Sequence, residues 1–177
     1  MHVFLHASQQ KIKIMKKLFM LVMLFSGITA NTQELPTEPA EGFSFPLGSK
    51  FTIKPYPADS TTFNYSVTAF EPFHEIIDIW DHDSLFADTG KRGTIEMYFC
   101  LGTKGETEEE REKNMKVLLI IKNRTPYAIA YTSEIQIKEG GEYQETSNSG
   151  WFPGAKGMEI WSDMIYSIGI RELKRMQ

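Results

Sequence analysis

The stretch HEIIDIWDHD, residues 74–83, carries two histidines and four carboxylates within ten positions. On a helix, the spacing of His74, Asp78 and His82 would place all three side chains on one face. His and Asp side chains are acceptable zinc ligands, and Glu75 could serve as a base beside them, similar to the HExxH motif of metalloproteases. However, residues eight apart lie about 12 Å apart along a helix axis, so His74 and His82 could not share one metal ion.

A β-strand is the favoured interpretation of the same residues, because isoleucine and tryptophan are typical of strands. Successive side chains of a strand point to opposite faces. The strand would alternate His74, Ile76, Asp78 and Trp80 on one face with Glu75, Ile77, Ile79 and Asp81 on the other. We therefore predict a strand that runs into an acidic turn, with no catalytic residue, no bound metal and no cofactor.

A second group that could do chemistry is the aromatic pair Trp151 and Phe152, within SNSGWFPGAKGMEIW at residues 147–161. Glycines and a proline flank the pair, which predicts a loop at one end of the fold. Loops on a rigid scaffold often carry binding residues, and an exposed aromatic pair can stack on a sugar ring or anchor a protein. Trp151 and Phe152 are the candidate ligand-binding residues. In the alternative interpretation, their rings cap the open end of the core.

Nucleophilic catalysis has little support in the sequence. The chain has no GxSxG motif, and beyond residue 14 its only histidines are His74 and His82. Cys100, the single cysteine, falls within the predicted strand at residues 94–101, on the face opposite the large apolar side chains. An exposed thiol would be oxidised in an exported protein, so we expect Cys100 to be covered and inert.

The N-terminal residues have the layout of a secretory signal peptide. From Met15, two lysines precede an apolar run at residues 18–28, and small and polar residues follow. This layout predicts upstream sequence at residues 1–14, a signal peptide at residues 15–30 and a mature chain that starts between Asn31 and Gln33. The apolar run has about half of the ~20 residues that a membrane-spanning helix needs. We expect a soluble protein of the periplasm or the extracellular space, without a permanent membrane span.

The charge balance excludes nucleic acid as a partner. Four of the 19 basic residues and none of the 23 acidic residues precede residue 33, which leaves 15 basic and 23 acidic residues, a net charge of −8. Such a negative chain repels phosphate backbones. Residues 31–42 are rich in proline, glutamate and threonine and predict a flexible spacer. Residues 43–177 are expected to form a single domain.

Apolar residues that alternate with period two predict an all-β domain. Strand-like segments lie near residue 50 and at residues 63–70, 74–81, 94–101, 116–122, 127–137 and 164–170. Residues 116–122 form a continuous apolar run, which is typical of a strand covered on both faces. The turn NRTP suggests that this strand pairs with residues 127–137 as an antiparallel hairpin. The expected fold is an immunoglobulin-like β-sandwich of two antiparallel sheets, with about seven or eight strands.

One helical turn is predicted within TEEEREKN, because Thr107 and Glu110 have the spacing of a capping box. The segments YFCLG, VLLIIKN and YAIAYTSEI, with the closing PG…EIW, resemble uncharacterised, exported bacterial proteins with immunoglobulin-like β-sandwich domains. The resemblance covers roughly the C-terminal half of the chain. It implies a fold, and it carries no functional residue across.

These features predict a secreted or periplasmic, non-catalytic binding module whose ligand is a protein or a glycan at the cell surface. One alternative is a metal-dependent hydrolase that uses residues 74–82. The other alternative is a structural subunit that assembles through exposed edge strands.

Overall fold

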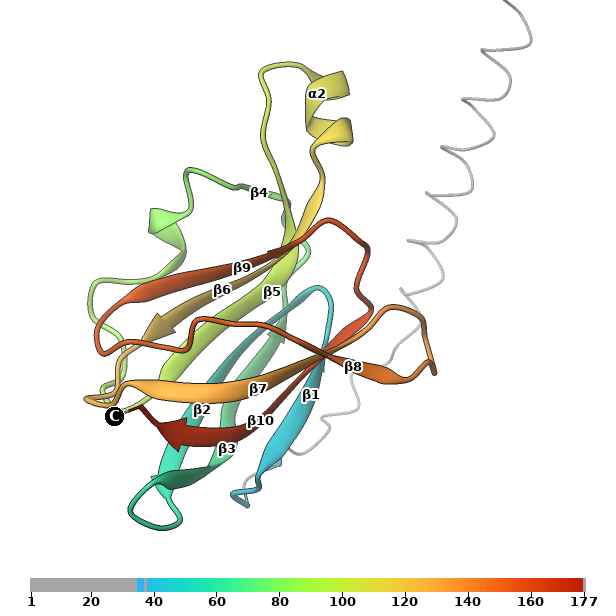
Figure 1. The fold of residues 1–177 in the computed structure, drawn as a ribbon. Coiled ribbons are helices and arrows are strands. Elements are labelled where there is room, and N and C mark those ends of the chain that lie inside the picture. Colours follow the sequence, from blue (N-terminus) through green and yellow to red (C-terminus); the bar gives the residue numbers. More distant parts are fainter. Residues whose placement is uncertain (1–34, 37, 177) are drawn as a thin grey trace, which may run out of the picture. The chain divides into compact units, whose positions relative to one another are not determined.

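The computed structural model describes residues 35, 36 and 38–176 (Figure 1). The predicted signal peptide and the residues upstream of it lie outside this range. Of the predicted spacer, Ala40 forms an antiparallel bridge with Tyr65, and Leu35 packs against the main core. Within the described range, no helix is long and apolar enough to cross a membrane.

The described residues are nearly all β. The strands in chain order are β1 (Gly42–Pro46), β2 (Ser49–Pro57), β3 (Thr62–Pro72), β4 (Ile77–Asp78), β5 (Ile95–Thr103), β6 (Lys116–Asn123), β7 (Ile129–Gln136), β8 (Tyr143–Thr146), β9 (Lys156–Trp161) and β10 (Ser167–Arg175). A 3-10 turn, η1 (Asp83–Leu85), follows β4, and the short helix α2 (Glu108–Lys113) joins β5 to β6. The helix carries the predicted capping box, because the Thr107 hydroxyl accepts from the Glu110 N–H and the Glu110 carboxylate accepts from the Thr107 N–H.

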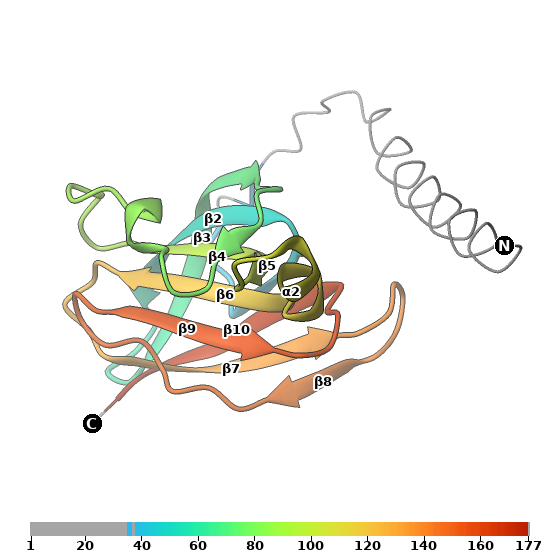
Figure 2. The same ribbon diagram turned by 90° about the horizontal axis from the view of Figure 1, so that it is seen from above.

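All the strands belong to one sheet, which curls into a half-barrel (Figures 1 and 2). The order is β8-β7-β10-β3-β2-β5-β6-β9, with β1 also paired to β10 and β4 to β5. The predicted two-sheet, immunoglobulin-like sandwich is therefore wrong. The expected hairpin is wrong as well, since β6 lies between β5 and β9 whereas β7 lies between β10 and β8.

The turn after β6 explains why the hairpin does not form. The buried Asn123 side chain accepts hydrogen bonds from the N–H and the hydroxyl of Thr125, at 2.9 and 2.7 Å. Its amide group donates to the carbonyls of Tyr127, at 2.8 Å, and of Trp151, at 3.0 Å. After this turn the chain leaves β6, crosses the open side of the half-barrel and enters β7 near the opposite edge of the sheet (Figures 1 and 2). The connection from β8 to β9 spans the same open side.

Two irregularities in pairing accompany the curl of the sheet. Between Arg171 and Lys174 the register of β10 against β7 shifts, and Glu172 at this point has a positive φ of 51°. A second shift lies between Thr52 and Ile53, where β2 pairs with β3. Bulges of this kind bend a strand and increase its twist. A sheet that bends in this way can fold around one core without a second sheet to cover it.

The concave face of the sheet holds the main core. In β5 the predicted alternation is confirmed, since Ile95, Met97 and Phe99 all belong to this core. The convex face of β5 and β6 carries a second, smaller core that includes Tyr98 and Cys100. The β6 segment is therefore covered on both faces, as its apolar run predicts.

Residues 74–83 form an extended segment that covers the second core and pairs only briefly. Only Ile77–Asp78 pairs with β5, in parallel, so the predicted strand at residues 74–81 is much shorter than expected. The Asp78 carboxylate accepts from the N–H groups of Trp80, at 2.8 Å, and Asp81, at 3.3 Å, and this turn ends the pairing. Ile77 and Ile79, which the prediction placed together on one face, are both buried, whereas Trp80 on the other predicted face is 74% exposed.

Candidate functional site

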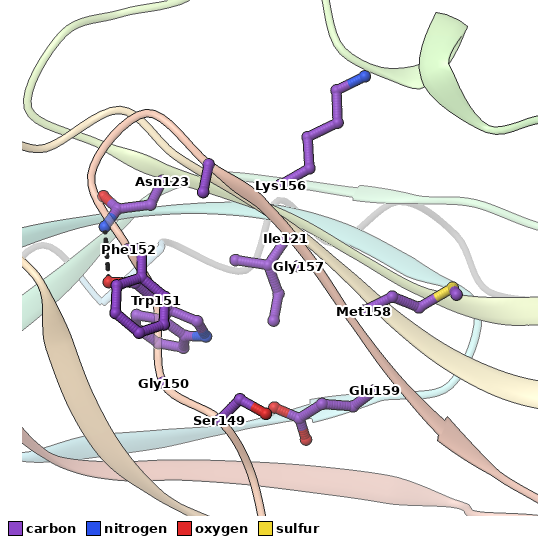
Figure 3. Close-up of a pocket in the computed structure, with 11 residues that line it drawn as sticks. Ile121, Asn123, Ser149, Gly150, Trp151, Phe152, Lys156, Gly157, Met158 and Glu159 are labelled. Atoms are coloured by element: carbon purple, nitrogen blue, oxygen red, sulfur yellow. Dashed lines mark hydrogen bonds between the residues drawn. The ribbon is translucent and has the colours of Figure 1, made fainter.

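The candidate site is a cavity at the open side of the half-barrel, between the edge strand β9 and the connection that leads into it. Its volume is about 180 Å³. The residues that define its chemistry are Ser149, Trp151, Phe152, Gly157 and Glu159 (Figure 3). Both aromatic residues that were predicted to bind a ligand therefore line this cavity.

The register between β6 and β9 explains why a cavity forms here. Leu119 pairs with Glu159 and Ile121 pairs with Gly157. Residues directly paired in an antiparallel sheet project on the same face. Because Leu119 and Ile121 belong to the main core, Glu159 and Gly157 also face the concave side. A Cβ atom added at Gly157 would meet no atom within 4 Å, so the cavity occupies the space where this position lacks a side chain.

Trp151 forms the inner wall of the cavity and is only 2% exposed. Its backbone pairs with Ile129 through hydrogen bonds of 2.8 and 2.9 Å, and its ring stacks on Tyr131 with 4.1 Å between centroids. The indole nitrogen lies on the side of the ring that faces Ile121 and the cavity (Figure 3). No hydrogen-bond acceptor among the described residues reaches this buried N–H. A buried donor left without a partner costs about 1–3 kcal/mol.

Glu159 supplies the second polar atom of the cavity. Its side chain points towards Ser149 (Figure 3), and its buried Oε2 atom has no hydrogen-bond partner within residues 35–176 as far as they are described. Burial raises the pKa of this carboxyl group to about 8, because the charged form loses its hydration. At neutral pH the group therefore mainly holds its proton and can both donate and accept a hydrogen bond.

The two residues of the predicted aromatic pair differ in burial and in role. Trp151 closes the open side of the main core, as the alternative interpretation expects, and it also lines the cavity. The Phe152 ring is 53% exposed and lines the same cavity, where a ligand could stack on it. The sequence pattern predicts a loop around this pair, but residues Lys156–Trp161 form β9, and Glu159 on that strand was not among the predicted site residues. The segment KGMEIW does carry the pattern of a strand, because its carboxylate alternates with apolar residues.

The chemical groups of residues 74–83 are not gathered at one point. His74 and Glu75 line a small hollow of about 190 Å³ together with Phe73. The Nδ1 atom of His82 lies 3.0 Å from the Ile79 carbonyl oxygen. In the described part of the chain, no three His, Cys, Asp or Glu side chains are grouped in a way that could hold a metal ion.

Cys100 is completely buried in the second core, which confirms that the thiol is covered. Its cover is the segment that includes Ile77, Ile79 and Phe86. Burial raises the pKa of the thiol to about 12, because the thiolate would lose its hydration. Since the thiolate is the nucleophile, this environment suppresses its reactivity.

A third hollow, of about 390 Å³, has Asp88, Arg92, Lys122 and Arg124 in its lining, and two of these cations contribute to the fold. The Arg124 guanidinium pairs with Glu96 at 2.8 Å and donates to the Ala87 carbonyl at 2.6 Å. The Lys122 ammonium donates to the Gly154 carbonyl at 2.6 Å. These two cations are already engaged, whereas the Trp151 indole N–H and the Glu159 Oε2 atom of the first cavity have no partner among the described residues.

Comparisons with protein-family models, with curated proteins and with solved structures found no match to this chain. The geometry of the chain itself is therefore the basis for a functional proposal. Its strongest feature is a cavity with two buried polar atoms that lack partners.

Proposed function

We propose that this chain is an exported, non-catalytic binding protein, and that its cavity at Trp151 and Glu159 receives part of the ligand. One observation carries the proposal. The indole N–H of Trp151 and the Oε2 atom of Glu159 are buried, lack hydrogen-bond partners among the described residues and belong to the lining of one cavity. Buried polar groups in native proteins are nearly always hydrogen-bonded. A ligand that enters the cavity would supply the missing partners.

The chemistry of the lining supports binding over catalysis. The described lining residues include one carboxyl group and no histidine or cysteine. Most glycoside hydrolases need a pair of carboxyl groups, and a serine nucleophile needs an adjacent base. Glu159 and Ser149 together do not make up either set.

The volume of the cavity indicates how much of the ligand it can hold. Sites for whole drug-sized ligands measure about 300–1,000 Å³, whereas this cavity measures about 180 Å³. It therefore suits the terminal group of a larger molecule. The rest of that molecule would continue past Phe152, whose ring is more than half exposed.

Filling the cavity tests the proposal. Gly157→Leu would place a side chain in the open space, and Ile160→Thr on the exposed, outward face of the same strand is the matched control. The full chain and both variants would be screened against arrays of oligosaccharides and of peptides, with thermal unfolding as a check of folding. We expect the array signal to fall at least about tenfold in Gly157→Leu and to remain in Ile160→Thr. An undiminished signal in Gly157→Leu, or no signal from the unmodified chain, would contradict the proposal.

Export has its own test, because it concerns residues outside the described range. Expression of the full chain in a bacterium, followed by intact-mass measurement, should give a periplasmic or secreted form that begins between Asn31 and Gln33. A mass that retains residues 1–30 would contradict export with cleavage.

A further inference from the structure

We infer that the group received by the cavity is a sugar ring at the end of a glycan, recognised through its hydroxyl groups; this inference rests on the proposed binding function. Four features support a hydroxylated ligand. They are the hydrogen-bonding needs of the two polar atoms, the charge of the cavity, the exposed ring at the cavity and the position of the polar atoms behind the sheet edge.

The two polar atoms need complementary partners. The indole N–H of Trp151 can only donate a hydrogen bond, so its partner must accept. A carboxyl group can always accept, and Glu159 can also donate while it holds its proton. An ammonium group only donates and cannot satisfy Trp151. A hydroxyl group donates and accepts, so neighbouring hydroxyls of one sugar ring can satisfy both atoms.

Charge also favours a neutral ligand. A cationic ligand needs an ionised carboxylate, but burial keeps the Glu159 carboxyl mainly protonated near pH 7, since its pKa is about 8. The nearby Lys156 ammonium is paired with Asp83 at 2.7 Å, so it is already engaged. A neutral, hydroxyl-rich group requires no change in the charge of the cavity.

Phe152 provides the apolar surface that a sugar ring also needs. Its ring is 53% exposed and lines the cavity together with Trp151. One face of a sugar ring presents mainly C–H groups, which pack against an aromatic ring while the hydroxyls at the edge remain free to form hydrogen bonds. A ring held in this way would direct hydroxyl groups towards Trp151 and Glu159.

The position of the polar atoms argues against a peptide strand. A peptide that extends a sheet binds the free edge of the outer strand through backbone hydrogen bonds. Glu159, in contrast, projects from β9 to the concave side, in register with the core residue Leu119. The unpartnered atoms therefore lie behind the edge, where a strand added to β9 would not reach them.

The experiment combines protein variants with modified sugars. The full chain is screened on an array of neutral oligosaccharides and, in parallel, on a peptide array. Monodeoxy analogues of the terminal sugar that binds best are then measured by calorimetry against the unmodified chain, Trp151→Phe and Ile160→Thr. Trp151→Phe removes the N–H and keeps an aromatic ring, and Ile160→Thr is the control on the outward face.

We expect one monodeoxy analogue to bind the unmodified chain about tenfold more weakly, the effect of one lost hydrogen bond. The same analogue should bind Trp151→Phe with less than about a twofold loss relative to the parent sugar, because the N–H partner is already absent. Ile160→Thr should behave as the unmodified chain. If Trp151→Phe does not fold, Phe152→Ala at the exposed ring, combined with the deoxy series on the unmodified chain, takes its place. Phe152→Ala should then weaken sugar binding about tenfold.

The outcomes separate this inference from the proposed function. If peptides bind and Gly157→Leu abolishes their binding, the cavity is a binding site and the sugar inference is wrong. If sugars bind but no deoxy analogue loses affinity, or if the loss of every analogue is unchanged in Trp151→Phe, the inference is also wrong. If no probe binds in a way that Gly157→Leu disrupts, both proposals fail and water alone fills the cavity.

Discussion

Glu159 projects towards the main core from the edge of the sheet, a position where an apolar side chain would be more favourable. Besides its proposed part in binding, the carboxyl group has a consequence for the edge itself. A molecule that paired with this edge would bury the ionisable carboxyl group still further, which is unfavourable, and short edge strands also discourage pairing between sheets of different molecules. The other edge strand, β8, has only four residues. These two features oppose assembly of the chain through its edges.

The raised pKa of Glu159 predicts how stability depends on pH. Burial raises this pKa from 4.5 to about 8, so the folded state binds the proton more tightly than the unfolded state. The free energy of unfolding should therefore fall as the pH rises from about 4.5 to about 8 and level off above that range, by at most about 5 kcal/mol. Urea denaturation between about pH 5 and about pH 9 measures this slope. Glu159→Gln, which has no proton to lose, should flatten the slope, and an equal slope in both proteins would assign it to other groups.

The environment of Cys100 predicts an inert thiol. Because the side chain is fully buried and its pKa is raised to about 12, a thiol reagent should label the native protein slowly. After denaturation it should label one equivalent, since the chain has a single cysteine. Ile79→Ala, which thins the cover over the second core, should speed native labelling. Rapid labelling of the unmodified native protein would show that the cover opens readily.

Individual side chains were predictable from sequence where they follow the alternation of one strand. The register of residues 94–101 placed Cys100 opposite Ile95, Met97 and Phe99, and the structure confirms it. Glu159 was not predictable in the same way. Glycines and a proline flank its strand and indicated a loop, and the partner strand that orients Glu159 lies far away in sequence.

At the scale of elements, Tyr65 joins three strands. Its hydroxyl group accepts from the Phe43 N–H of β1 at 2.9 Å and donates to the Ile170 carbonyl of β10 at 2.6 Å. Tyr65→Phe would leave both backbone groups without this partner and should lower the free energy of unfolding by about 1–3 kcal/mol. Tyr166→Phe, at a 40% exposed side chain, is the control and should change it by less than about 0.5 kcal/mol. Chemical denaturation of the three proteins measures the difference, and equal losses would show that the Tyr65 bonds contribute little.

The positions of the strands and of the helix in the sequence were more predictable than the pairing of the strands in the sheet. Local patterns located β2, β3, β5, β6 and β7, and the spacing of Thr107 and Glu110 located α2. Which strands pair depends on contacts between distant residues. The alternation of apolar and polar residues within one strand does not reveal these contacts. The NRTP turn has the residues of a hairpin turn, yet the Asn123 amide group bonds to the Trp151 carbonyl 28 residues later. A long-range bond of this kind gives no local signal, so β6 and β7 were wrongly paired.

For the whole molecule, alternation predicts one buried and one exposed face per strand, which both a sandwich and a curled sheet satisfy. The choice between them depends on bulges and on the path of β10. This strand pairs with β7 along one side, and with β1 and then β3 along the other. A strand with three partners joins segments that would otherwise belong to separate sheets. The bulge near Glu172 has no sequence pattern that marks it.

The central place of β10 has a consequence for the order of events during synthesis. β10 is the last strand in chain order, and the Tyr65 hydroxyl meets the Ile170 carbonyl across a separation of 105 residues. Contacts so distant in sequence form slowly, because a long loop must close before they are made. A nascent chain that still lacks β10 cannot join β7 to β1 and β3, so these strands should stay unfolded until β10 has been synthesised. We expect a chain that ends at residue 163 to lack cooperative unfolding and to be digested rapidly by protease, whereas a compact, resistant product would show that the remaining strands fold alone. A polypeptide that stays unfolded until β10 has emerged is one that a translocase can still thread through a membrane.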